Sequence, residues 1–194
     1  MRTLTALLFA GIMASVAVAG LDPATDSFGV YFDTAGNTNC TTAAPFQAVT
    51  AYLLLMNPAG PTNGFECTVT MVGAPYYLLA SNIACGWDFP DNEPPYDYAA
   101  GCAFDYPVLE GGAIVLVTWS IMLQEPSELL FHIGPARVPS LPGGLPVVAG
   151  EGVRRLCGVA SGDVNLPVAA INAGAGCPVS AQASTFGTVK SLFR

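Results

Sequence analysis

One stretch of the chain, residues 113–123 (AIVLVTWSIML), is longer and more continuously apolar than any other after residue 20. Thr118 and Ser120 give its second half an alternating pattern, which is typical of a strand with two different faces. Its β-branched and aromatic residues favour a strand over a helix, as do the glycine pair before it and the proline after it. We therefore expect the central strand of a sheet here. The side expected to face the core carries Val115, Val117, Trp119, Ile121 and Leu123.

The cleanest alternation lies in residues 65–72, where apolar side chains occupy every second position and Glu66, Thr68 and Thr70 lie between them. This pattern predicts a strand with one face on the core and one face in water. Further strands are expected at residues 27–33, 46–56, 76–79, 128–133 and 164–171.

Turn residues separate these stretches about every 10–15 residues, and no helix-length periodic segment lies between them. The chain is therefore predicted to be all-β, an antiparallel β-sandwich with an immunoglobulin-like or cohesin-like arrangement. A jelly roll is the next choice, and an α/β fold is disfavoured because it needs helices between the strands.

Residues 57–73 (NPAGPTNGFECTVTMVG) follow an apolar strand and resemble the early strands of cohesin-type and related bacterial secreted β-sandwiches. In those proteins a strand ends in a short loop, and a Gly-Phe-Glu-like start opens the next strand. The whole chain also resembles uncharacterised exported bacterial proteins that begin like residues 28–33 (FGVYFD) and end like residues 185–194 (TFGTVKSLFR). The first resemblance implies a sandwich fold, and neither resemblance assigns a role to a residue.

The two ends of the chain have their own patterns. Residues 1–19 combine Arg2, an apolar run and a final Ala-Val-Ala, which predicts a secretory signal peptide cleaved before Gly20. Residues 20–183 then form the β-sandwich domain. Residues 184–194 are expected to form a short amphipathic helix, because Phe186, Val189 and Phe193 fall on one face of a helical period. In the favoured interpretation it docks on the sandwich; in the other it is presented to a partner as an export or attachment signal.

Six cysteines follow the predicted cleavage site, and an even number in an exported chain indicates three disulfides. Pairing of sequence neighbours is expected, because the pairs 85/102 and 157/177 each bracket a loop-like segment, which leaves 40/67. Zinc is disfavoured, since no C-x-x-C pair occurs. No metal or cofactor is predicted. The cysteines are Cys40, Cys67, Cys85, Cys102, Cys157 and Cys177.

Composition narrows the choice of partners and location. Only 10% of the residues are charged and the net charge is −8, so nucleic acid is excluded as a partner because phosphate binding requires clustered Lys and Arg. No later segment reaches the roughly 18 apolar residues of a membrane span. A secreted or cell-surface location is expected.

Catalytic chemistry finds little support in the sequence. His132 is the single histidine, and no serine lies in a G-x-S-x-G elbow, so a hydrolytic triad is not expected. Loop carboxylates occur, but nothing fixes the separation that glycoside hydrolysis requires. The protein is therefore predicted not to be an enzyme.

The segment between Cys85 and Cys102 is expected to be a loop, since it contains three prolines, and to be the contact surface. Its aromatic and acidic side chains are typical of a stacking platform for sugar rings or a shallow calcium site. In the alternative interpretation the aromatic side chains fold back onto the sandwich as a lid. The ligand-binding candidates are Trp87, Phe89, Tyr96, Tyr98, Asp88, Asp91 and Asp97.

Together these patterns predict a secreted, non-catalytic binding or interaction module with a glycan or an extracellular protein as ligand. The alternative is a self-associating structural subunit of an extracellular surface layer or fibre, which the low charge and high apolar content also fit.

Overall fold

The computed structural model describes residues 22–85, 87–88, 94–109, 111–174 and 176–178. These residues form strands and no helix, and in this described part no helix is long and apolar enough to cross a membrane. The predicted signal peptide, residues 1–19, and the predicted helix at residues 184–194 lie outside the described residues.

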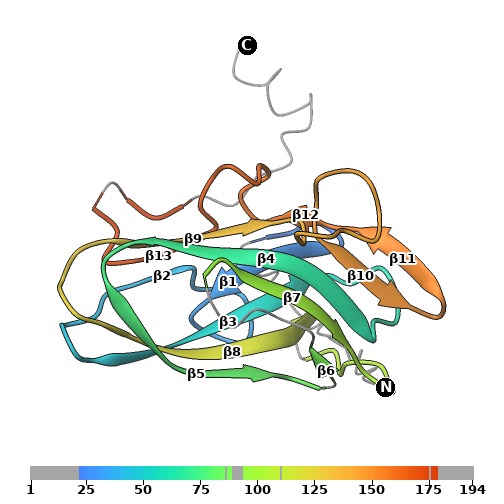
Figure 1. Ribbon diagram of the computed structural model, residues 1–194, viewed down its shortest axis with the longest axis horizontal. Coiled ribbons are helices and arrows are strands. Elements are labelled where there is room, and N and C mark those ends of the chain that lie inside the picture. Colours follow the sequence, from blue (N-terminus) through green and yellow to red (C-terminus); the bar gives the residue numbers. More distant parts are fainter. Residues whose placement is uncertain (1–21, 86, 89–93, 110, 175, 179–194) are drawn as a thin grey trace, which may run out of the picture.

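The strands form two sheets that pack face to face (Figure 1). The first, sheet A, has five strands, and the apolar segment expected at its centre is one of its inner strands. In spatial order sheet A consists of β12 (Gly158–Val159), β1 (Ser27–Tyr31), β3 (Ala48–Met56), β8 (Ala113–Leu123) and β5 (Tyr76–Ile83).

The second sheet, sheet B, has eight strands arranged around the long strand β4 (Gly64–Gly73). Along β4, Glu66 pairs with Ala99 on one side and with Val147 on the other, whereas Thr68 pairs with β7 and β9. β10 and β9 therefore follow one another along one edge of β4, and β7 runs along the other. The other strands are β2 (Cys40–Thr41), β6 (Trp87–Asp88), β7 (Tyr96–Gly101), β9 (Leu129–Gly134), β10 (Val147–Gly150), β11 (Val153–Leu156) and β13 (Ala169–Ile171).

The sheets are mixed rather than purely antiparallel. Most neighbours run antiparallel, as predicted, but β1 pairs in parallel with β12 and β2 pairs in parallel with β13. Both parallel partners are short strands from the last third of the chain, which return to lie beside the first strands. The predicted strand at residues 164–171 is limited to the three residues of β13.

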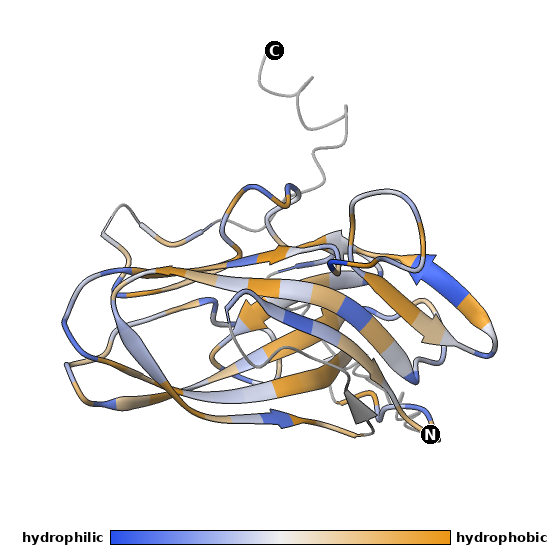
Figure 2. Ribbon diagram, in the orientation of Figure 1, coloured by the Kyte–Doolittle hydropathy of each residue, from blue (hydrophilic) through white to orange (hydrophobic). Residues whose placement is uncertain are grey.

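The core lies between the sheets and is built by alternation. Phe65, Cys67, Val69 and Met71 of β4 face inward, as predicted, and alternate with half-buried polar side chains. Figure 2 shows the matching change between hydrophobic and hydrophilic segments along β4. Because successive side chains of a strand point to opposite faces, this pattern fixes which side of sheet B meets sheet A.

The predicted inward face of β8 is correct except for Val115. A β-bulge shifts the register, since Leu53 pairs with Val117 but Leu54 pairs with Val115. The extra residue, Leu116, reverses the side on which the preceding side chains lie. Val115 therefore packs on the outer side of sheet A, in a second apolar cluster. The buried members of this outer cluster are Tyr31, Leu54, Met56 and Ala113.

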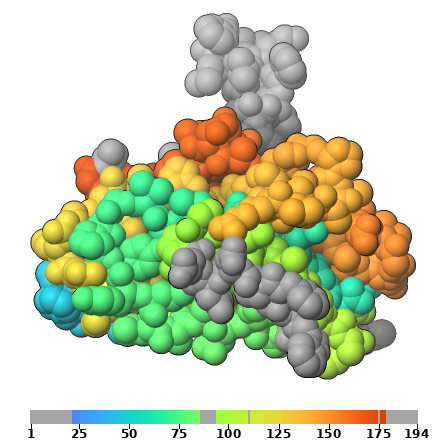
Figure 3. Space-filling view, in the orientation of Figure 1, coloured from blue at the N-terminus to red at the C-terminus, as the bar shows by residue number. Residues whose placement is uncertain are grey.

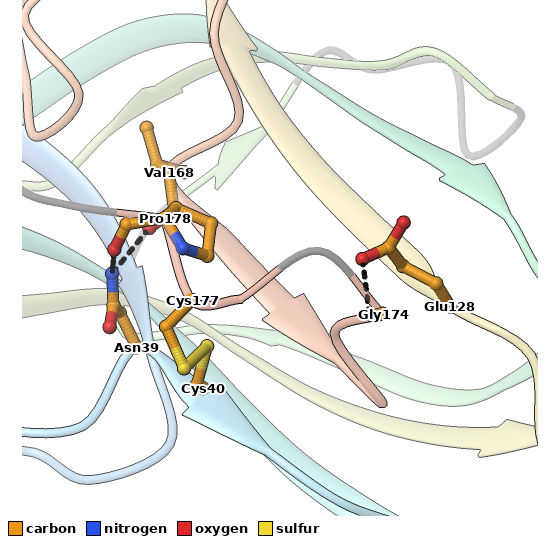
Figure 4. The surroundings of a disulfide bond; sticks show 7 residues. All are labelled: Asn39, Cys40, Glu128, Val168, Gly174, Cys177 and Pro178. Atoms are coloured by element: carbon orange, nitrogen blue, oxygen red, sulfur yellow. Dashed lines mark hydrogen bonds between the residues drawn. A yellow bond between two sulfur atoms is a disulfide. The ribbon is translucent and has the colours of Figure 1, made fainter.

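The disulfides differ from the predicted set. Cys85 pairs with Cys102, as expected, but Cys40 pairs with Cys177, across 137 residues of sequence (Figure 4). Cys67 and Cys157 are buried thiols in the core, so the predicted 40/67 and 157/177 bridges are wrong, and so is the count of three. Sequence proximity failed here because β2 lies beside β13, so that Cys40 comes close to Cys177 although the two are far apart in the sequence.

Candidate partner-binding site

The segment between Cys85 and Cys102 is not the continuous loop that its prolines predicted. Its three prolines lie between two strands, so that β6 and β7 pair antiparallel on either side of them. Tyr96 and Tyr98 belong to β7 and are only 5% and 3% exposed. They point into the core and therefore cannot form an exposed platform for sugar rings, which corrects their assignment as ligand-binding residues.

The two tyrosines instead connect the sheets. The Trp119 Nε1–H of β8 donates a hydrogen bond of 2.9 Å to the Tyr98 hydroxyl. The hydroxyls of Tyr76 and Tyr96 lie 3.1 Å apart, and burial raises the pKa of the Tyr76 phenol. Phe65 packs against Tyr98 with ring centroids 6.0 Å apart. The burial of these two side chains agrees with the alternative interpretation, but they belong to a strand of sheet B and not to a loop that folds back as a lid.

The other candidates in this segment have different positions. Trp87 and Asp88 form β6, whereas Phe89 and Asp91 lie outside the described residues. Asp97 lies on the outer side of β7, where its Oδ1 accepts a hydrogen bond of 3.0 Å from the Arg137 backbone N–H. Of the predicted set, Asp97 is the one residue that the described structure places on the outer side of sheet B.

The loop of residues 135–146, which joins β9 to β10, is held against the outer face of sheet B. The Arg137 guanidinium donates to the Pro95 carbonyl oxygen at 3.1 Å, and the Ser140 backbone N–H donates to Glu66 Oε1 at 2.6 Å. In Figure 3 this loop, in light orange, lies against the green surface of β4 and β7. The carboxylates of Asp97 and Glu66 thus hold this loop in place, and the loop forms a wall that rises from the outer face of sheet B.

A groove of about 360 Å³ lies beside this wall, over the outer sides of β7, β4 and β10. Its floor is made of very small residues, so the backbone of three neighbouring strands is close to the surface. A Cβ at Gly64 would lie 3.2 Å from the Ala100 carbonyl oxygen, so a larger residue here would fit tightly. The small floor residues are Gly64, Ala99, Gly101 and Ala149.

Charged and polar side chains surround this floor. Glu66 of β4 and Arg154 of β11 line the groove together with Ser140 of the loop. Arg154 is exposed and Glu66 is half-buried, so a carboxylate and a guanidinium face a common ligand space. This groove suits a partner segment that is extended and carries both a basic and an acidic group, rather than a flat apolar ligand.

The neighbouring arginine has a structural role. Arg155 Nε donates to Asp26 Oδ2 at 2.8 Å, and its Nη2 donates to Asp26 Oδ1 and to the Thr62 hydroxyl. Burial alone would raise the pKa of the Asp26 carboxyl, but the hydrogen bonds from Arg155 and from the Ala59 N–H outweigh burial and lower that pKa. This ion pair ties the start of β1 to β11.

His132, the single histidine, is not among the residues that line the groove. His132 lies on the outer side of β9, opposite Thr70, and burial lowers the pKa of its imidazole. In the described part of the chain, no three His, Cys, Asp or Glu side chains are grouped so that they could hold a metal ion.

Sequence reasoning missed the groove because its floor carries no chemical signal. Glycine and alanine carry no polar or charged group, and β4, β7 and β10 are separated in the sequence and meet only in the sheet. The alternation in residues 96–101 (YDYAAG), directly after the last proline of the segment, was the available signal for β7.

Comparisons with known proteins identify the fold. No protein-family model matches this chain, and no curated protein matches it in sequence. The structure is similar to that of a type II cohesin dyad from the adaptor ScaA scaffoldin of Acetivibrio cellulolyticus, with 14% identity and a TM-score of 0.53. That match covers 77% of this chain and 49% of the dyad, so the chain spans about half of its length.

A second similar structure is a type II cohesin domain from the cellulosome of the same organism. It is 14% identical with a TM-score of 0.50, and the match covers 77% of this chain and 96% of that domain. The chain therefore has a cohesin-like β-sandwich fold, as the resemblance of residues 57–73 implied.

Proposed function

We propose that this protein is an extracellular, non-catalytic protein-binding module whose contact surface is the groove on the outer face of sheet B. The observation that carries the proposal is the groove itself: a floor of small residues across three strands, bordered by Glu66 and Arg154. The cohesin-like fold supports it, because the two similar structures are domains of a scaffoldin and of a cellulosome.

Protein binding fits this site better than carbohydrate binding. Sugar rings stack on exposed aromatic faces, and the two tyrosines of β7 are buried in the core. A protein ligand instead requires shape complementarity at a water-excluding centre and a rim of polar groups that fix its orientation. The floor of small residues offers the concave surface, and Glu66 and Arg154 offer the polar rim. Glycan binding remains a prediction that rests on Trp87 and Phe89.

An extracellular location is part of the proposal. Disulfides form and persist in oxidising environments, and the described chain holds two of them. The predicted signal peptide in residues 1–19 supports the same location. N-terminal sequencing of the exported protein should find Gly20 as the first residue.

The test fills the groove without disturbing the fold. A Cβ at Gly101 meets no atom within 4 Å, and its backbone is not in the left-handed region, so Gly101→Arg should fold normally and occupy the groove. Gly174→Arg is the matched control, because a Cβ at Gly174 is equally free and the residue lies outside the groove.

Both variants and the parent protein would be immobilised and exposed to the proteins secreted by the producing cells. We expect one protein to be retained by the parent and by Gly174→Arg and lost with Gly101→Arg. Equal retention by all three would remove the groove as the contact surface. A glycan array with Trp87→Ala as control covers the carbohydrate alternative, and glycan binding that depends on Trp87 but not on Gly101 would contradict the proposal.

A further inference from the structure

The edges of the two sheets differ in how they are protected against pairing with another strand. An open edge presents unpaired backbone N–H and C=O groups, and proteins block such edges with short strands, charges, prolines or bulges. β2, β6 and β12 are two residues long, and β11 carries Arg154 and Arg155. Each of these four edges therefore has a recognised form of protection.

β5 is the least protected edge among the described strands, because a bulge is its only protective feature and it has neither a short length nor a charge or proline. It is an edge strand of eight residues that pairs only with β8, and its sequence YYLLASNI contains no charge and no proline. Figure 1 shows it along the lower edge of the sandwich. Tyr77 and Leu79 are 50% and 52% exposed. Its one irregularity, a bulge between Leu78 and Ala80, leaves a leucine at the surface and not a charge.

Charge determines which partner fits this edge. Two copies of a chain with a net charge of −8 repel one another unless they meet where charges are absent. None of the residues in the five strands of sheet A is charged. A second copy can therefore bring its own β5 against this edge without a like-charge contact between the paired strands.

Geometry also favours a second copy. Two identical edges can pair antiparallel about a two-fold axis, so that the same residues are used by both partners. With the axis near the middle of β5, the two Leu79 side chains meet at the axis and the two Tyr77 side chains flank them. The contact is limited to one pair of strands about 27 Å long. Interfaces below the standard buried area are typically weak, so we expect a weak association.

We propose that β5 pairs antiparallel with β5 of a second copy, joining the two A sheets into one continuous sheet about a two-fold axis near Leu79. This surface is separate from the groove on sheet B. The dimer would leave both grooves open to their partners.

Sedimentation velocity over a concentration series tests the proposal on the pure protein. The parent chain should change from monomer to dimer between micromolar and millimolar concentration. Leu79→Lys places two like charges at the axis and should weaken dimerisation by about tenfold or more. Val138→Lys is the matched control, since Val138 is 87% exposed in the loop after β9 and should leave the dimer unchanged.

A charge-pair experiment tests the two-fold axis. Leu79→Lys and Leu79→Asp should each dimerise at least about tenfold more weakly than the parent, whereas their equimolar mixture should form a heterodimer at lower concentration than either variant forms a dimer. A parent chain that stays monomeric at millimolar concentration overturns the proposal, and so does a Leu79→Lys variant that dimerises as the parent does. A mixture that stays monomeric overturns the axis near Leu79. If the pure protein stays monomeric but β5 amides become protected when another protein is added, β5 accepts a foreign strand and the second-copy pairing is wrong.

Discussion

Sheet A and sheet B bury similar inner faces but differ completely on their outer sides. The strands of sheet A carry no charged residue, whereas sheet B presents Glu66, Asp97, His132 and Arg154 on its outer side. In Figure 2 the hydrophilic segments accordingly gather on strands such as β11. The difference shows that one sandwich can keep its charged side chains on one sheet and build the other from uncharged strands.

The cause lies in what covers each outer side. On sheet A the outer cluster of Tyr31, Leu54, Met56 and Ala113 is buried by neighbouring segments, and a Cβ at Gly36 would collide with Met56. The parts of β1, β3 and β8 that form this cluster are buried on both sides and are accordingly apolar on both sides. On sheet B the loop of residues 135–146 contacts the outer side through Glu66, Pro95 and Asp97, and the strands alternate with polar residues outside.

The largest expected effect concerns how sheet B is held together. β2 has only two residues, and the Cys40–Cys177 bridge fastens it to the segment after β13. The Asn39 amide adds hydrogen bonds to the carbonyl oxygens of Val168 and Pro178 (Figure 4). Replacing both cysteines by serine should lower the free energy of unfolding by about 4–5 kcal/mol, because the bridge closes a long loop.

The control is the same double replacement of Cys85 and Cys102. This bridge spans only 17 residues and should contribute about 3 kcal/mol by the same chain-entropy argument. Urea unfolding of both variants measures the difference. An equal loss in the two variants would contradict the loop-length explanation.

The next largest effect tests the connection between the sheets. Trp119 is fully buried in β8 and donates to Tyr98 of β7. Trp119→Ala should lower the free energy of unfolding by about 3–5 kcal/mol through the cavity it leaves. Trp119→Phe retains most of the packing but loses the indole N–H, and should therefore cost less. If both variants cost the same, the hydrogen bond between the sheets matters more than packing.

A smaller effect compares the two outer faces directly. Leu54→Ala on the outer side of sheet A removes a fully buried side chain and should cost about 2–4 kcal/mol. Arg154→Ala on the outer side of sheet B should change stability by less than about 0.5 kcal/mol, because its side chain is exposed. Thermal and urea unfolding would show this contrast. Similar losses from both variants would break the distinction between a packed and a solvated outer face.

The smallest effect is a pH dependence. The pKa of Asp26 is lowered in the folded state, so its ion pair with Arg155 contributes stability above the unfolded-state pKa of about 3.9 and loses it as the pH falls through the lower folded-state pKa. Asp26→Asn should cost about 1–3 kcal/mol at neutral pH and much less in acid. Unfolding curves at both pH values check this; a cost that is equal at the two would contradict the ion-pair assignment.

Local patterns in the sequence predicted the strands well. The alternation in β4 and β9 identified their inward faces, because a period of two depends only on near neighbours. The bulge in β8 escaped prediction, since pairing with β3 produces it, and Val115 was therefore placed on the wrong side. The Cys40–Cys177 bridge escaped for a similar reason, because only the fold brings its two ends together.

The candidate site was predicted less well than the fold. Aromatic and acidic residues drew attention to the segment between Cys85 and Cys102, but Tyr96 and Tyr98 are core residues. The floor of the groove is made of residues with very small side chains or none. Gly64 and Gly101 form a depression only when three strands lie side by side. Composition along a chain does not report such a concave surface.

Hydrogen–deuterium exchange of the protein, alone and bound to the secreted protein that it retains, tests the central claim most directly. The proposed function predicts slower exchange in β4, β7, β10 and the loop of residues 135–146, with β3 and β8 unchanged. Protection of sheet A with unchanged exchange around Gly101 would contradict the claim that the outer face of sheet B is the partner-binding surface.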